Sequence, residues 1–326
     1  MNDGTTIVAV DVGGTNARFA LATLSPGQPP KLGPLYRYDT AAWPDLAGAW
    51  AQFLKDSGAE GVKAASIAVA GPVGGDTIKF TNNPWVFRPA TLAQELGLDG
   101  LLILNDFGAM AHAVHWLRAD ESRRIAGPAA WPESGVTTII GPGTGLGVAM
   151  TLRRDGHIHA IETEGSHIDF APLDSFETRI ADRLRERFRR CSVERLVSGP
   201  GLASIREAIA AFEGLAIVPG DDKTLWANAL DGGDPVAARA LERLVLIFGA
   251  VTGDLALAQG ANAVMIVGGL SNRMADLLAA PAFADRFAAK GRHETRMRNI
   301  AIRLCTHEQP GLLGAAAAFQ AEYLQA

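Results

Sequence analysis

Cysteines, long apolar runs and concentrated positive charge are all scarce in this sequence of 326 residues, and each scarcity excludes a class of protein. The two cysteines, Cys191 and Cys305, are far apart and form no Cys-x-x-Cys pair, so neither a disulfide framework nor a cysteine-rich zinc site is expected. No window of 18 consecutive apolar residues occurs, so no membrane span is expected. The first residues lack the basic segment and apolar stretch of a signal peptide. Together these features predict a cytoplasmic protein with no membrane partner.

The charge balance argues against a nucleic-acid partner. The net charge is -5, and a surface that neutralises phosphates needs clustered Lys and Arg. The one basic cluster, RLRERFRR at 183–190, lies on a helical pattern and is interpreted as a solvent-facing helix surface. With 48% hydrophobic and 20% charged residues, a chain of this length can form about two domains with ordinary cores.

A pattern of strand, glycine turn and strand occurs twice. Apolar runs at 7–10 and 19–22 flank the first turn, and runs at 136–140 and 148–152 flank the second. This repetition predicts two related α/β halves. Further strands are expected at 65–69, 101–104, 264–267 and 300–304, and helices at 41–54, 91–96, 175–188, 193–197, 202–212, 236–259 and 311–324.

Both glycine turns have the composition of a phosphate-binding loop. Glycine lets the backbone approach a phosphate and point N–H groups at its oxygens, and Thr15 and Thr144 could add hydroxyl donors. Neither turn ends in Gly-Lys-Ser/Thr, which excludes a P-loop, and each precedes a strand where a Rossmann turn needs a helix. A plain hairpin turn is the alternative, but two Gly-Thr turns favour phosphate binding.

Asp11 stands at the start of the first turn. A carboxylate beside the β- and γ-phosphates of a nucleotide can hold Mg²⁺, often through water. The alternative is an aspartate that accepts a hydrogen bond from its own turn.

Five motifs together resemble the superfamily of sugar kinases, heat-shock proteins and actin, and within it the bacterial glucokinases. DVGGTNAR at 11–18 and GPGTGLG at 141–147 match the two phosphate motifs, and VMIVGGLSNRM at 264–274 matches the adenosine motif. EGSHIDFAP at 164–172 and VERLVSGPGL at 193–202 match the sugar segment and the helix after it. The resemblance runs from residue 7 to about 319, with the motifs in matching order.

The resemblance implies an α/β, two-domain actin-like (ribonuclease H-like) ATPase fold, with mixed sheets flanked by helices and an active site in the interdomain cleft. The expected domains are a small one, residues 1–115 plus 307–326, and a large one, residues 116–306. The family also implies a homodimer.

The nucleotide side of the site follows from the phosphate and adenosine motifs. The resemblance implies ATP and Mg²⁺, with Asp11 holding the metal through water. It assigns nucleotide binding to Val10, Asp11, Val12, Gly13, Gly14, Thr15, Gly143, Thr144, Gly145, Gly268 and Gly269. Pro142, within the second turn, has no N–H to offer to a phosphate.

Asp106 follows the apolar run 101–104 and precedes a helical pattern. A hydroxyl is a poor nucleophile, so its phosphorylation requires a carboxylate that accepts its proton. Position alone leaves two roles for Asp106: a rigid base, or the N-cap of the next helix. The resemblance implies the base, with Asn105 holding sugar hydroxyls.

The other sugar contacts rest on the resemblance. It implies that Glu164, His167 and Glu194 bind hydroxyls of the hexose and that Asn82 also contacts it, whereas Trp85 is expected to pack in the core or in a lid. Taken alone, Glu194 is an acid in a first helical turn, and Glu162 is as good a candidate as Glu164. The family has Glu-Gly-Gly-His where this chain has Ser166 as the third residue. No cysteine occurs in IDFAPLDS after His167, so the zinc motif of related repressors is absent and no zinc is expected.

The resemblance implies transfer of the ATP γ-phosphoryl group to the 6-hydroxyl of glucose, with domain closure on sugar binding that limits hydrolysis of ATP. A kinase for another hexose or an amino sugar is the main alternative, and ADP or polyphosphate is an alternative donor. A sugar-responsive repressor needs a DNA-binding segment where only ten residues precede Asp11. An actin-like filament protein would not need the paired sugar carboxylates.

Overall fold

The computed structural model describes residues 4–71, 73–80, 83–218 and 220–324, in two compact units. The first unit is Met1–Ala119 with Ala160–Glu162 and His307–Ala326, and the second is Asp120–His159 with Thr163–Thr306. These units run close to the ranges expected from the sequence, with the short segment 160–162 added to the first. The division into domains that move separately stays a prediction.

The sheet of the first unit is built around three parallel strands, β1 (Thr5–Val12), β5 (Ala64–Val69) and β8 (Gly100–Asn105). Its order is β3-β2-β1-β5-β8, where β2 (Asn16–Leu24) is antiparallel to β1 and also pairs with β3 (Lys31–Leu32) and β4 (Tyr36–Asp39). The carboxyl ends of β1, β5 and β8 therefore meet at one edge. In open α/β sheets this edge is where ligands bind.

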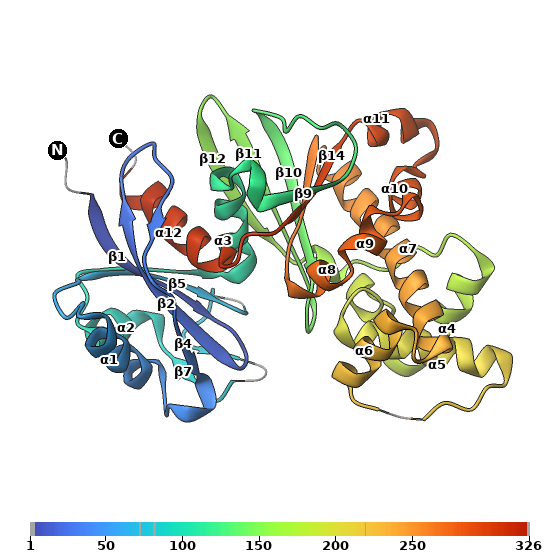
Figure 1. The fold of residues 1–326 in the computed structure, drawn as a ribbon, viewed down its shortest axis with the longest axis horizontal. Coiled ribbons are helices and arrows are strands. Elements are labelled where there is room, and N and C mark those ends of the chain that lie inside the picture. Colours follow the sequence, from blue (N-terminus) through green and yellow to red (C-terminus); the bar gives the residue numbers. More distant parts are fainter. Residues whose placement is uncertain (1–3, 72, 81–82, 219, 325–326) are drawn as a thin grey trace. The chain divides into compact units, whose positions relative to one another are not determined.

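Helices cover both faces of this sheet (Figure 1). Side chains alternate along β1, so Val8, Val10 and Val12 pack toward α1 (Leu46–Ser57) and α2 (Pro89–Leu96). Ile7 and Ala9 pack on the other side, toward α3 (Asp106–Ala113) and α12 (Pro310–Tyr323). Asp11 alternates with Val10 and Val12, which places it on the α12 side.

The first helix starts later than the sequence predicted. Residues 40–42 form only a 3-10 turn, and α1 begins at Leu46. The Asp45 side chain caps it by accepting the N–H of Gly48 at 2.8 Å. The apolar spacing before Pro44 therefore did not mark the helix start; the capping aspartate after it did.

The second unit repeats the strand arrangement of the first. Its sheet has the order β12-β11-β10-β13-β14-β9, with β10 (Gly135–Pro142), β13 (Ala263–Ile266) and β14 (Ala301–Cys305) parallel to one another. β11 (Leu146–Arg154) forms the antiparallel hairpin with β10, as β2 does with β1. The remaining strands are β9 (Ser122–Ala126) and β12 (His157–Thr163). The two related halves predicted from the sequence are confirmed.

One long buried helix, α7 (Pro235–Ala258), organises the rest of this unit. It packs against α5 (Gly199–Glu213), α6 (Asp222–Asp231) and α10 (Pro281–Ala288). The other helices are α4 (Ser175–Phe188), α8 (Gly269–Arg273), α9 (Ala275–Ala279) and α11 (Glu294–Arg298). The helix expected at 193–197 is wrong: these residues form only a 3-10 turn, Val193–Arg195. Glu194 therefore does not lie in the first turn of an α-helix. Within the described part of the chain, no helix combines the length and apolar character needed to cross a bilayer.

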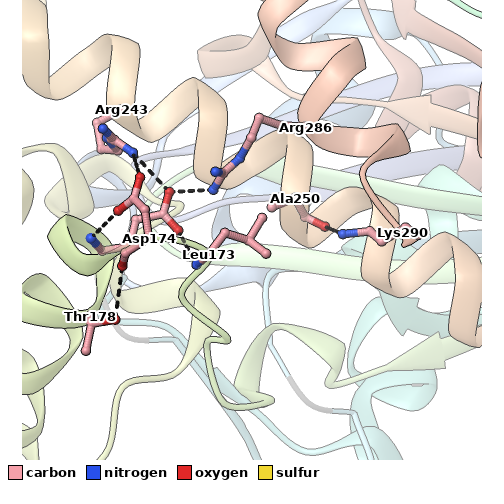
Figure 2. A network of polar contacts seen from close by, with 8 residues as sticks. Leu173, Asp174, Thr178, Arg243, Ala250, Arg286 and Lys290 are labelled. Atoms are coloured by element: carbon pink, nitrogen blue, oxygen red, sulfur yellow. Dashed lines mark hydrogen bonds and ion pairs between the residues drawn. The ribbon is translucent and has the colours of Figure 1, made fainter. Parts of the chain in front are cut away.

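A buried ion network joins α4, α7 and α10 (Figure 2). Glu177 is fully buried and pairs with Arg286 and, at 3.2 Å, with Arg243. Asp174 caps α4 by accepting the N–H of Glu177 at 2.7 Å, and it accepts from Arg243 at 2.7 Å. The N–H of Leu173 donates to Glu177 at 2.8 Å, so the network also fixes the chain leading into α4.

Candidate active site

Asn105 and Asp106 lie where β8 ends and α3 begins. Asn105, rather than Asp106, caps the helix: its Oδ1 accepts the N–H of Phe107 at 2.8 Å. Its Nδ2 donates to the carbonyl of Gly71, two residues after the end of β5, at 3.1 Å. Asp106 is the first helical residue, and its Oδ1 accepts from the same Phe107 N–H at 3.0 Å. The capping role that position allowed for Asp106 is thus filled by its neighbour.

The environment of Asp106 makes its carboxyl a weaker acid. Burial is the main cause that raises its pKa to about 7, and the charge of Asp11 raises it further. Glu162 adds a smaller rise, while hydrogen bonds from the backbone N–H groups of Phe107 and Asp106 act in the opposite direction. A carboxylate with this pKa can accept a proton near neutral pH.

Asp11 lies at the same edge of the first sheet, before the turn between β1 and β2. Its side chain is 17% exposed, and its Oδ2 pairs with Nη1 of Arg18 at 2.8 Å. Burial raises the pKa of Asp11, and Arg18 partly offsets this rise. Mg²⁺ is commonly bound through one or two carboxylates together with substrate phosphates, and Asp11 can supply such a carboxylate. The described residues contain no group of three or more His, Cys, Asp or Glu that could hold a metal.

The first glycine turn is braced from outside. The N–H of Gly13 closes the turn onto the carbonyl of Asn16 at 2.9 Å, while its carbonyl accepts from Asn83 at 3.0 Å. Thr40 donates its N–H to the carbonyl of Thr15 at 3.0 Å and its hydroxyl to that of Gly14 at 3.2 Å. Val10 and Val12 are fully buried and belong to the core of the first unit, so their predicted contact with a nucleotide stays a prediction.

Asn83 is a supporting residue that the sequence did not single out. It is 7% exposed, and its Oδ1 accepts the N–H of Trp85 at 2.9 Å. Trp85 is 1% exposed, which confirms its predicted place in the core. The only local signal for Asn83 was its position before a proline, which is typical of a turn. Asn82, the predicted sugar contact beside it, lies outside the described residues.

In the second unit the turn Gly143–Gly145 joins β10 to β11. The N–H of Gly143 closes this turn onto the carbonyl of Gly145 at 2.7 Å, as Gly13 does in the first turn. The carbonyl of Gly143 accepts the N–H of Gly199 at the start of α5, at 2.7 Å. Thr144 is exposed. Pro142 ends β10, where its missing N–H costs little.

Glu194 lies directly against the second glycine turn. Its Oε2 accepts the N–H of Leu146 at 3.0 Å, and a Cβ at position 145 would overlap this carboxylate. Gly145 leaves room for this close approach. Glu194 and Thr144 also line one pocket of about 360 Å³. A residue assigned to the sugar thus adjoins a turn assigned to phosphate.

The predicted adenosine motif lies beside the second turn, because the parallel strands β10 and β13 end at the same edge. Val267 donates its N–H to the carbonyl of Ile140 at 2.9 Å. Gly268 has a φ of 95°, in the left-handed region, and Gly269 begins α8. Asn272, which the sequence did not single out, donates to the carbonyls of Gly268 at 3.1 Å and Cys305 at 3.0 Å.

The predicted sugar segment keeps Glu164 and His167 together. Oε2 of Glu164 lies 3.8 Å from Nε2 of His167, and both side chains are more than half exposed. Arg190 holds this segment: its Nη2 donates to the carbonyl of His167 at 2.8 Å and to Asp169 at 2.7 Å. Ser166 is buried in a 3-10 turn without a positive φ, so the backbone here does not need glycine.

Comparisons with known proteins identify the family of the chain. The sequence model of the glucokinase family matches residues 8–322. The glucokinase of Zymomonas mobilis subsp. mobilis is 52% identical over 318 residues, which are 97% of this chain and 98% of the relative.

Solved structures give the same picture. The crystal structure of a glucokinase from an Antarctic psychrotroph is 30% identical, with a TM-score of 0.86, and covers 96% of this chain and 98% of its own. A glucokinase of the ROK family from Streptomyces griseus, solved with glucose and AMPPNP, is 20% identical with a TM-score of 0.57, covering 96% and 98%. These similarities confirm the actin-like α/β fold and a hexose kinase. The chain belongs to the glucokinase family.

Proposed function

We propose that this protein transfers the γ-phosphoryl group of ATP to the 6-hydroxyl of glucose, with Asp106 as the general base. The observation that carries this proposal is the Asp106 carboxyl, whose pKa is raised to about 7 at the junction of β8 and α3. Membership of the glucokinase family supports the substrate, and the Streptomyces griseus relative was solved with glucose and a nucleotide analogue.

In the proposed reaction Asp106 accepts the proton of the 6-hydroxyl as its oxygen bonds to the γ-phosphorus. The bond from that phosphorus to the β,γ-bridging oxygen breaks, ADP leaves, and the proton passes to solvent. The helix cap uses one oxygen lone pair of the Asn105 amide, and the contact with Gly71 uses one N–H. The remaining lone pair and N–H of this amide bind a sugar hydroxyl. Glu164, His167 and Glu194 bind the other hydroxyls, and carboxylates are strong acceptors for them.

The nucleotide is proposed to contact the two glycine turns and the turn at Gly268 and Gly269. Thr15 and Thr144 supply hydroxyl donors. Asp11 would hold Mg²⁺ through water, and the metal would neutralise charge on the transferring phosphoryl group. Arg18, through its pairing with Asp11, keeps that carboxylate oriented.

Two further points rest on the family resemblance. We propose that the protein works in the cytoplasm and as a homodimer. Light scattering coupled to size-exclusion chromatography tests the dimer: a particle of twice the 34.3 kDa chain mass supports it, and a monomer at micromolar concentration contradicts it.

A coupled assay with Mg-ATP tests the function directly. Glucose, mannose, fructose and N-acetylglucosamine are compared by kcat/KM, and glucose is expected to give the highest value. A higher value for another sugar would assign the kinase to that sugar. No turnover of any of the four would refute the proposal.

A further inference from the structure

Glu162, near the end of β12, contacts the chain at the start of α3. Its Oε1 accepts the backbone N–H of Asn105 at 3.0 Å, although the two residues are 57 positions apart. Asn105 caps α3, and Asp106 follows it. The Glu162 carboxylate therefore holds the peptide between Leu104 and Asn105, one residue before Asp106.

The helix leaves room for this carboxylate at one position. Gly108 is buried in α3, and a Cβ there would overlap the Glu162 side chain. Glycine is unfavourable relative to alanine inside a helix. Its presence two residues after Asp106 is explained by the approach of Glu162.

The charge of Glu162 also affects Asp106. The charged groups that act on it are Asp11 from β1 and Glu162 from β12, and both disfavour its ionisation. Burial is the larger cause, and the backbone N–H of Phe107 opposes all three. Removal of the Glu162 charge should therefore lower the pKa of Asp106.

We infer that Glu162 is a positioning residue for Asp106, acting through its hydrogen bond to Asn105 and its fit against Gly108. The inference rests on the proposed function, because it assigns Glu162 to the same reaction. Glu162 does not touch the sugar in this account. It helps to fix the direction of the residue that takes the proton and makes a small addition to its basicity.

Four variants test this: Glu162→Ala, Glu162→Gln, Gly108→Ala and the double variant Glu162→Ala/Gly108→Ala. Glu162→Ala removes the acceptor, and a small displacement of a catalytic group is costly, so kcat is expected to fall at least about tenfold. Gly108→Ala displaces Glu162 and should match that loss. Once Glu162 is gone, the added methyl has nothing to displace, so the double variant should lose no more activity than Glu162→Ala alone.

Glu162→Gln keeps an oxygen acceptor but removes the charge. It should retain kcat within about threefold at its optimum, while the acid limb of the pH profile of kcat/KM moves toward lower pH. A purely structural role would not move that limb. The matched control is Glu60→Gln, which removes an exposed charge from the first unit that does not act on Asp106. It should leave the profile in place.

Parental kcat and an unmoved pH profile in the Glu162 variants would overturn the inference, as would multiplicative losses in the double variant. Should Glu162→Ala or Gly108→Ala fail to fold, the profile of Glu162→Gln still decides. If the parent enzyme phosphorylates glucose and the Glu162 variants are unaffected, this inference is refuted but the proposed function is not. A parent without hexose kinase activity refutes the proposed function, and thermal unfolding of the same four chains still tests the contact.

Discussion

Two acidic clusters in this protein stand at the start of helices and have opposite electrostatics. At the edge of the first sheet, Asp106 begins α3 with Asp11 nearby, and Arg18 pairs with Asp11. At the start of α4, Asp174 and Glu177 share Arg243, and Glu177 also pairs with Arg286 (Figure 2). Both clusters lie at a helix N-terminus. Asp106 is largely buried and its neighbour Asp11 pairs with one arginine, whereas in the second cluster Glu177 is buried, Asp174 is exposed, and two arginines pair with them.

The pKa shifts follow burial and the neighbouring charges rather than the helices. Burial pushes the pKa of Asp174 upward, but the Glu177 N–H and Arg243 outweigh it and lower the pKa. Burial raises the pKa of Asp106 to about 7, and a second carboxylate adds to the rise. A helix dipole favours ionised acids at both places, so it cannot explain the difference. A buried acid left without a cation is typical of a functional site, and a compensated one of a structural cluster.

The largest expected effect separates the two clusters by activity. Asp106→Ala should lower kcat at least about 10²–10⁴-fold, because the general base is lost. The KM for glucose should change much less. Steady-state assays with saturating Mg-ATP measure both, and a kcat near the parental value would show that Asp106 is not the base.

The second prediction breaks the compensated cluster. Glu177→Gln leaves Arg286 and Arg243 without their buried anion, which should lower the free energy of unfolding by about 2–4 kcal/mol. Denaturant unfolding measures this, and kcat at a temperature where the variant is folded should stay within about twofold. Glu213→Gln, which breaks the exposed pair with Arg239, is the matched control and should have a much smaller effect. Equal effects of the two substitutions would contradict the structural role of the network.

The third prediction is a substitution that raises the free energy of unfolding, whereas the second lowers it. The folded-state pKa of Asp106 lies above its unfolded value of 3.8, so the protonated carboxyl favours folding and this contribution is lost as pH rises toward about 7. Asp106→Asn should therefore stabilise the protein by about 1–3 kcal/mol at pH 8, even though it lowers activity. At pH 4 the gain should nearly vanish. A variant that is less stable than the parent at pH 8 would contradict the account of this cluster.

The smallest expected effect concerns the sugar side of the second unit. Glu194→Gln keeps an oxygen for the N–H of Leu146 but loses the charge, so the KM for glucose should rise about tenfold. Glu207→Gln, in the same pocket, serves as the control and should leave KM unchanged. An unaltered KM in Glu194→Gln would remove Glu194 from the sugar site.

The sequence predicted the parts of the fold that local patterns encode. Apolar strands followed by glycine turns led to both hairpins, and the helix at 175–188 was predicted with its observed bounds. Short or exposed elements, such as β12 and α8, were missed, because a five-residue helix or a polar edge strand has little periodicity. Asp106 was placed at its strand end by the same local reasoning.

The supporting contacts of the site could not be predicted in this way. Each of these contacts joins segments that are far apart in the sequence. They are the contacts of Glu162 with Asn105, of Asn83 with Gly13, and of Asn272 with Cys305. The sequence also does not show which of two adjacent residues caps a helix when both side chains can do so. Asn105 and Asp106 are such a pair, and the backbone geometry selects Asn105. The sequence predicted the residues proposed to carry the chemistry but not those that hold them in place.

The pH dependence of kcat/KM for glucose, at saturating Mg-ATP, tests the central claim most directly. Asp106 must be ionised to accept the proton, so kcat/KM should fall as pH drops, with an acid limb near the pKa of about 7. The residual activity of Asp106→Asn should lack that limb. A profile that stays level from about pH 5 to 8, or a limb that persists unchanged in Asp106→Asn, would contradict the assignment of Asp106 as the base.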